Sequence, residues 1–229
     1  MSYHLGNHFP QSVRDFVWQY RDHVYANGKE SKYPWLKLLI DAPFKEMYAE
    51  AKAMEEHFVN HMENSEDPWY EEGQHQGWFS ICIAKEDMRL VDLGYKNKRV
   101  RVWTEASKLC PVTTNYFKNI FPMKTYYRLR FMLLKPGGYV QPHSDSLTTN
   151  PSYAINISLN NPNGCFLVTE KGTVPFDDKG SVFLFNNYYK HSVINESEED
   201  RYHIILHGRW DDTNKDIRKT IMQYGEGRN

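Results

Sequence analysis

Residues 126–145 read YYRLRFMLLKPGGYVQPHSD, and this stretch decides the fold. From Tyr126 to Leu134 the side chains alternate with a period of two, which is typical of a β-strand. Pro136-Gly137-Gly138 then gives a turn signal. The chain continues through Pro142 into His143-Ser144-Asp145. Because residues two apart in an extended segment point to the same side, this imidazole and this carboxylate should face one point.

Other short stretches with the same period surround this one. They are Trp78 to Ile83, Tyr153 to Leu159, Gly164 to Thr169, Ser181 to Phe185 and Tyr202 to His207. Turn signals separate them at Asn161-Pro162-Asn163-Gly164 and at Asp177-Asp178-Lys179-Gly180. Several short strands with turns between them indicate a sandwich or a jelly roll.

The first third of the chain has a helical period instead. Its apolar residues recur at three- and four-residue steps: Phe44, Met47, Tyr48, Ala51, Met54 and Phe58. Pro43 suits the first turn of this helix, and Asp41 offers a capping carboxylate. A shorter helix is expected from Val13 towards Val24, ending near Gly28, and the acidic stretch from Glu63 to Glu72 is expected to be a loop.

We therefore expect helices packed on a β-core within one domain over residues 1–229. Residues 1–75 should form a mainly helical N-terminal layer, 76–210 the β-core and 211–229 a C-terminal tail. A single domain suits a mostly β chain of this length.

Charge and composition exclude several classes of protein. The net charge of −1 argues against non-specific electrostatic binding of nucleic acid. No apolar run approaches the roughly 18 residues of a membrane helix, and the first residues lack the layout of a secretion signal. Three scattered cysteines are too few for a disulfide framework. We expect a cytoplasmic protein that binds neither nucleic acid nor membrane.

A third candidate metal ligand follows the His143-x-Asp145 pair. His191 lies 48 residues after His143, just beyond the apolar stretch from Val182 to Phe185. Two histidines and one carboxylate form the facial triad of non-haem Fe(II) oxygenases, which leaves three coordination positions open. His57 and His61 should share a helix face but have no third ligand nearby, so we expect them to be ordinary.

Arg201 stands ten residues after His191, at the head of an apolar strand. Alternation places Arg201, His203 and Ile205 on one face. Burying an arginine costs free energy unless an anion pairs with its guanidinium, and a dicarboxylate co-substrate would supply that anion. The alternative is a salt bridge to Glu198, Glu199 or Asp200 just before it, and spacing alone leaves both interpretations open.

The stretch from Arg130 to Trp210 resembles the aspartyl/asparaginyl β-hydroxylase family of Fe(II)/2-oxoglutarate oxygenases. The matching features are Leu134-Lys135-Pro136-Gly137-Gly138, Pro142-His143, Gly164-Cys165, Gly180-Ser181-Val182-Phe183-Leu184-Phe185-Asn186, His191-Ser192-Val193 and Arg201. The resemblance implies a mostly β double-stranded β-helix, a cupin-like jelly roll, with the N-terminal helices packed on it. It also implies His143 and His191 as iron ligands, and Arg201 as the clamp on the distal carboxylate of 2-oxoglutarate.

The sequence departs from the best-known members of that family at two positions. Those members have glycine two residues after the first histidine and bind iron through two histidines, whereas here Asp145 restores the full triad. Their co-substrate-binding serine aligns with Met132. Asn156 and Ser158 lie on the strand face that looks into the site in the family, so they are candidate co-substrate contacts, although a solvated face would also suit them.

Three more residues are candidates for the site. His203 could support Arg201 in binding the co-substrate, or be an ordinary core histidine. Arg128 and Arg130 share a face with Met132 and could bind the carboxylate of a substrate, although for Arg128 we favour a position on the surface.

We therefore expect an Fe(II)/2-oxoglutarate-dependent dioxygenase. It would hydroxylate a C–H bond of an aspartyl or asparaginyl residue, or of a free amino acid, so that its partner is a small-molecule or peptidyl substrate. One alternative is a cupin-type metalloenzyme that does not use 2-oxoglutarate. The other is a non-catalytic jelly-roll binding module.

Overall fold

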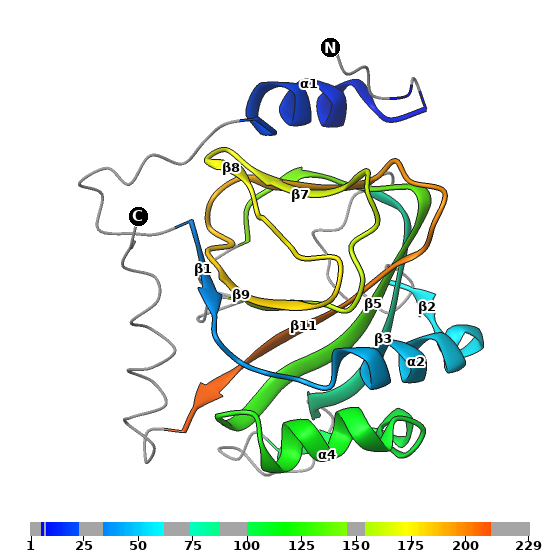
Figure 1. Ribbon diagram of the computed structural model, residues 1–229, viewed down its shortest axis with the longest axis vertical. Helices are drawn as coiled ribbons and strands as arrows, with labels where there is room; N and C mark the ends of the chain where they lie inside the picture. Colours follow the sequence, from blue (N-terminus) through cyan, green and yellow to red (C-terminus); the bar gives the residue numbers. More distant parts are fainter. Residues whose placement is uncertain are drawn as a thin grey trace.

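Figure 1 shows the computed structural model, which describes residues 6, 8–22, 34–61, 74–87, 100–145 and 154–211. The helices are α1 (Gln11–Tyr20), α2 (Phe44–Ala53) and α4 (Pro111–Asn119), with 3-10 turns η1 (Glu55–His57) and η2 (Glu105–Lys108). The strands are β1 (Trp35–Leu38), β2 (Val59–Asn60), β3 (His75–Asp87), β4 (Val100–Trp103), β5 (Met123–His143), β6 (Ala154–Ser158), β7 (Cys165–Thr169), β8 (Gly172–Thr173), β9 (Ser181–Phe185), β10 (His191–Asn195) and β11 (Arg201–Trp210).

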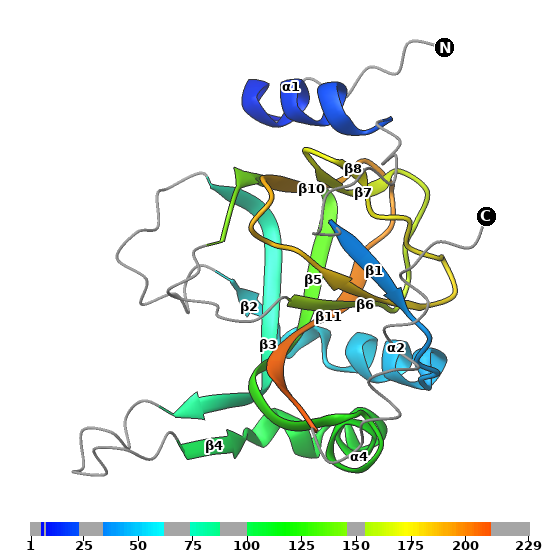
Figure 2. The ribbon, with the colours of Figure 1, turned by 90° about the vertical axis from the view of Figure 1, so that its left-hand side faces the viewer.

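The strands form a curled antiparallel sheet in the order β1-β9-β6-β11-β5-β10-β7-β8. Strand β3 pairs along the other edge of β5, and β2 and β4 pair with β3. Figure 2 shows β3 and β5 side by side along the height of the molecule. The curl closes two facing layers into a double-stranded β-helix, which confirms the expected mostly β fold with helices packed on it.

Strand β5 belongs to both layers because it bends without ending. Its first part pairs with β11 as far as Leu134, and from Tyr139 onward it pairs with β10. The bend falls at Pro136-Gly137-Gly138, where Gly137 has a φ of +72° that favours glycine. A Cβ on Gly138 would lie 2.7 Å from the carbonyl oxygen of Lys135. The stretch that the sequence marks as a turn is therefore a bend inside one strand of 21 residues.

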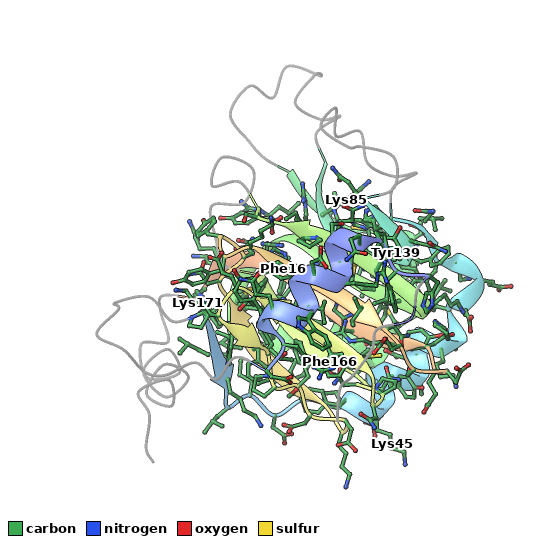
Figure 3. All side chains as sticks on the ribbon, turned by 90° about the horizontal axis from the view of Figure 1, so that it is seen from above. Phe16, Lys45, Lys85, Tyr139, Phe166 and Lys171 are labelled. Carbon is green, nitrogen blue, oxygen red and sulfur yellow. The ribbon has the colours of Figure 1, made fainter. Side chains whose placement is uncertain are left out.

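Three apolar clusters hold the layers together. The largest lies between the sheet and helices α2 and α4, and includes Met47, Phe117, Phe131 and Ile204. A second lies beneath α1, which packs across β5, β7 and β10, and it includes Phe16 and Tyr139 (Figure 3). The third fills the space between the two layers and includes Ala154, Leu167, Val174, Phe183 and Phe185.

The helices differ from their predicted bounds. Helix α1 ends at Tyr20, and α2 ends at Ala53, so that Phe58 lies beyond the η1 turn. Asp41 does not cap α2, whose N-cap residue is Pro43. The expected helix end near Gly28 and the expected loop from Glu63 to Glu72 lie outside the described residues.

The predictions did not include strands β1, β2, β4, β8 and β10 or helix α4. Strands β1 and β2 lie within residues 1–75, and β1 pairs with β9 at the edge of the sheet. Helix α4 follows Cys110, and Glu50 of α2 accepts hydrogen bonds from the backbone N–H groups of Val112 (2.7 Å) and Thr113 (2.9 Å). None of the helices in the described ranges combines the length and apolar character needed to span a bilayer.

Candidate active site

His143 and His191 lie side by side at the end of two paired strands. His143 is the last residue of β5, His191 is the first of β10, and the two are register partners. Their ring centroids are 4.3 Å apart. Asp145 follows two residues beyond the strand, and one ligand atom from each of the three residues lies within 4.8 Å of the others. The structure thus brings together the three residues that the sequence predicted as a triad.

Both imidazoles are oriented in the same way by the backbone. The Nδ1 atom of His143 lies 2.8 Å from the carbonyl oxygen of Gln141, and that of His191 lies 2.9 Å from the carbonyl oxygen of Tyr189. A carbonyl can only accept, so each Nδ1–H donates and each Nε2 keeps its lone pair for a metal. Burial and the nearby His143 lower the pKa of His191 to about 4, which keeps this ring neutral.

Asn187 holds the carboxylate of Asp145. The backbone N–H of Asp145 donates to the carbonyl oxygen of Asn187 at 3.0 Å. The side-chain amide of Asn187 donates to Oδ2 of Asp145 at 2.6 Å. The other oxygen, Oδ1, lies 3.8 Å from Nε2 of His143. One carboxylate oxygen is therefore left facing the imidazole pair.

Arg201 is buried with 1% of its surface exposed. Its Nε–H donates to Oδ1 of Asn161 at 3.1 Å, and Nη1 lies 3.4 Å from Nδ1 of His203. Within the described part of the chain no carboxylate forms an ion pair with Arg201, and Asp200 pairs instead with Lys135 at 2.8 Å. Burial lowers the pKa of Arg201. A buried guanidinium without a carboxylate is a ready site for an anionic ligand.

A cavity of about 150 Å³ between the two layers joins these groups. The cavity is lined by the three residues of the triad and by further predicted residues: Arg201, His203, Asn156, Arg128, Arg130 and Met132. Ser158, the remaining candidate, does not line the cavity, and its hydroxyl lies 3.5 Å from the carbonyl oxygen of Asp177. Asn156 reaches the cavity because Ile155 and Ile157 take the opposite, core-facing side of β6.

Among the residues of the cavity wall that sequence reasoning missed are His61, Trp78, Asn187 and His207. His207 could have been found, since the alternation that joins Arg201 to His203 continues to it. His61 does not share a helix face with His57, because it lies just after β2. Its Nδ1 atom is 2.9 Å from Oγ of Ser80 and its Nε2 atom is 3.4 Å from Nη1 of Arg130. No local spacing signals these contacts.

A double-stranded β-helix with this cavity defines a class of protein. Two neutral imidazole nitrogens and one carboxylate oxygen suit Fe(II) and leave positions open for other ligands. The buried guanidinium suits a dicarboxylate. The protein is a 2-oxoglutarate-dependent non-haem iron oxygenase, with Fe(II) as its metal and 2-oxoglutarate as its co-substrate.

Residues 41–209 match the model of the family described as "Aspartyl/Asparaginyl beta-hydroxylase", and the chain belongs to this family. A comparison with curated proteins finds no match.

Solved structures are similar in fold at low sequence identity. A prolyl-4-hydroxylase from Pseudomonas putida is 12% identical, with 79% of this chain and 95% of that chain covered and a TM-score of 0.46. A prolyl hydroxylase from Trichoplax adhaerens, in complex with a peptide fragment of the hypoxia inducible factor oxygen degradation domain, is 12% identical, with 80% and 86% covered and a TM-score of 0.46. An oxidoreductase of the 2OG-Fe(II) oxygenase family from Burkholderia pseudomallei is 10% identical, with 76% and 97% covered and a TM-score of 0.40.

Proposed function

We propose that this oxygenase hydroxylates a C–H bond of an aspartyl or asparaginyl residue, or of a related amino acid, at iron held by His143, Asp145 and His191. The observation that carries the proposal is the meeting of these three ligands and the buried Arg201 in one cavity. The family to which the chain belongs supports the choice of substrate.

Each residue has a defined task in this proposal. The two Nε2 atoms and Oδ1 of Asp145 would hold the metal, and a triad of this kind leaves coordination positions open for other ligands. Arg201 binds the distal carboxylate of 2-oxoglutarate and thereby sets the direction in which the co-substrate lies. Asn156 and His203 lie in the same cavity wall and are placed to contact it.

Bound iron and 2-oxoglutarate would supply the oxidising chemistry, in which O₂ gives one oxygen atom to the substrate and one to succinate as 2-oxoglutarate loses CO₂. The protein contributes position and exclusion of water. Arg130 and Arg128 line the cavity as well, so we propose that they bind the substrate, which is a small molecule or a peptide.

The test uses pure protein with Fe(II), 2-oxoglutarate and O₂. We expect succinate to form slowly without a substrate and faster with aspartyl or asparaginyl peptides, whose mass should rise by one oxygen atom. His143→Ala and His191→Ala should form no succinate, whereas His57→Ala, an exposed histidine outside the cavity, serves as the control. Iron-loaded protein that forms no succinate would contradict the proposal.

The cysteines bear on the compartment. Cys82, Cys110 and Cys165 all carry free thiols, and two of them are buried. Free thiols are typical of a reducing compartment, which supports our proposal that the protein works in the cytoplasm.

A further inference from the structure

We propose that Arg130, held in place by His61, binds a carboxylate of the substrate, so that the enzyme selects acidic over neutral substrates. This inference rests on the proposed function and restricts its range of substrates to those with a carboxylate. It also assigns His61 as a positioning residue that acts through Arg130.

Arg130 is tied into the cavity wall from three sides. On β5 it pairs in register with Ile205 of β11 and with Cys82 of β3. Its Nη1 atom lies 3.4 Å from Nε2 of His61. A guanidinium can only donate, so Nε2 of His61 accepts. The proton of this imidazole is then on Nδ1, which donates to Oγ of Ser80 at 2.9 Å.

The contacts of His61 suit it to a positioning role. Burial and the neighbouring Arg130 lower the pKa of His61 to about 3. The ring is therefore neutral at physiological pH and accepts from the guanidinium without repelling it. Trp78 packs against the ring with centroids 4.1 Å apart. Ser80 and Trp78 thus fix the imidazole, and the imidazole fixes one edge of Arg130.

The arginines of this wall lack a carboxylate partner within the described ranges. Among the residues that the structure describes, no carboxylate pairs with Arg130 or Arg128, and Asp145 is the one acidic side chain that lines the cavity. Burial and the nearby Arg128 lower the pKa of Arg130, and the neighbouring Cys82 opposes this shift. Arg130 is partly buried, and a partly buried guanidinium that has no carboxylate partner is stabilised by an incoming anion.

Iron and the co-substrate do not supply that anion. Fe(II) and Arg201 together carry three positive charges, and Asp145 with the two carboxylates of 2-oxoglutarate carries three negative charges. These groups balance one another and leave Arg130 without a carboxylate, whereas Arg128 is exposed and water solvates its charge. A carboxylate on the substrate would balance the charge of Arg130. It could be the side chain of a peptidyl aspartate or the α-carboxylate of a free amino acid.

The experiment measures binding without turnover. Protein loaded with Fe(II) and 2-oxoglutarate is titrated calorimetrically in the absence of O₂ with three probes: N-acetyl-L-aspartyl amide, its neutral isostere N-acetyl-L-asparaginyl amide, and free L-aspartate. We expect an acidic probe to bind at least 10-fold more tightly than the asparaginyl probe. Preference for the capped aspartyl probe would identify a side-chain carboxylate, and preference for L-aspartate an α-carboxylate.

Variants locate the effect. Arg130→Gln should weaken binding of the preferred acidic probe by about 100-fold and leave the asparaginyl probe unchanged. His61→Leu should weaken it by about 10-fold, and His61→Gln should restore much of the loss because its amide oxygen can accept from Arg130. Arg209→Gln, an exposed arginine on β11, and His57→Leu are the matched controls. Binding of 2-oxoglutarate should be equal in all of these proteins, which also shows that each is folded.

Equal binding of the charged and neutral probes to the natural protein would overturn the inference, and this comparison needs no variant. Binding of none of the probes, or an Arg130→Gln protein that keeps its preference, would overturn it as well. In each of these outcomes normal 2-oxoglutarate binding and succinate formation leave the proposed function standing. Loss of those two properties in the natural protein would instead contradict the proposed function.

Discussion

Replacing Arg201 with Gln should remove most of the affinity for 2-oxoglutarate. The side chain is 1% exposed, so its charge has lost nearly all contact with water. Asn161 and His203 contact it through neutral groups, and no described carboxylate does. When 2-oxoglutarate binds, its distal carboxylate would form a buried ion pair with Arg201. Removing one partner of a buried ion pair costs about 3–5 kcal/mol. At 1.4 kcal/mol for each tenfold change, the dissociation constant should rise by a factor of several hundred or more.

The assay separates this contact from the rest of the co-substrate site. Calorimetry on metal-loaded protein compares 2-oxoglutarate with 2-oxobutyrate, which keeps the 2-oxo acid end and lacks the distal carboxylate. The natural protein should bind 2-oxoglutarate far more tightly, and Arg201→Gln should bind the two compounds about equally. Binding of Fe(II) should stay the same in both proteins.

Thermal unfolding provides a second measurement. A ligand that binds only the folded state raises its stability in proportion to the logarithm of its concentration over the dissociation constant. Added 2-oxoglutarate should raise the melting temperature of the natural protein and have little effect on Arg201→Gln. If the variant bound 2-oxoglutarate with unchanged affinity, Arg201 would be a structural residue and our reasoning about it would be refuted.

Three further predictions concern other parts of the molecule. Asn187→Ala should weaken Fe(II) binding by about 10-fold, because the carboxylate of Asp145 loses its amide donor, and metal titration against Asn163→Ala checks this. The free energy of unfolding should fall as the pH drops below 6.5, since the pKa of His61 is about 3 when folded and ordinary when unfolded; urea titrations of His61→Gln should show a flatter pH profile. Glu50→Gln should cost about 1 kcal/mol of stability by weakening the cap of α4, an effect that Glu46→Gln should lack.

Several strands of the β-core could be predicted because their local sequence alternates with the environment of the side chains, although β4, β8 and β10 were not predicted. Ser181–Phe185 has the predicted bounds, and Ala154–Ser158 differs from its prediction by one residue at each end. In β6 the two faces are also as expected, with Ile155 and Ile157 in the core and Asn156 in the cavity. Successive side chains of such a strand point alternately to the core and to the cavity, so apolar and polar residues alternate in its sequence.

The course of β5 could not be predicted in the same way. Pro136-Gly137-Gly138 has the composition of a turn, and nothing local distinguishes a turn from a bend. The backbone continues as a strand because β3 pairs on both sides of the bend, with Leu134 facing Trp78 and Tyr139 facing Gln76. Partners that lie some 60 residues away in the sequence decided the conformation of this stretch.

The sequence by itself predicted the three residues that meet in the candidate metal site, because His143 and Asp145 share one short segment and His191 follows a strand from which the chain can return beside them. Only the tertiary structure decided what surrounds that site. Asn187 meets Asp145 across 42 residues of chain, and His61 meets Arg130 across 69. Contacts of this kind leave no periodic trace in a sequence, because each depends on the register between strands, and that register is settled by packing of the whole sheet.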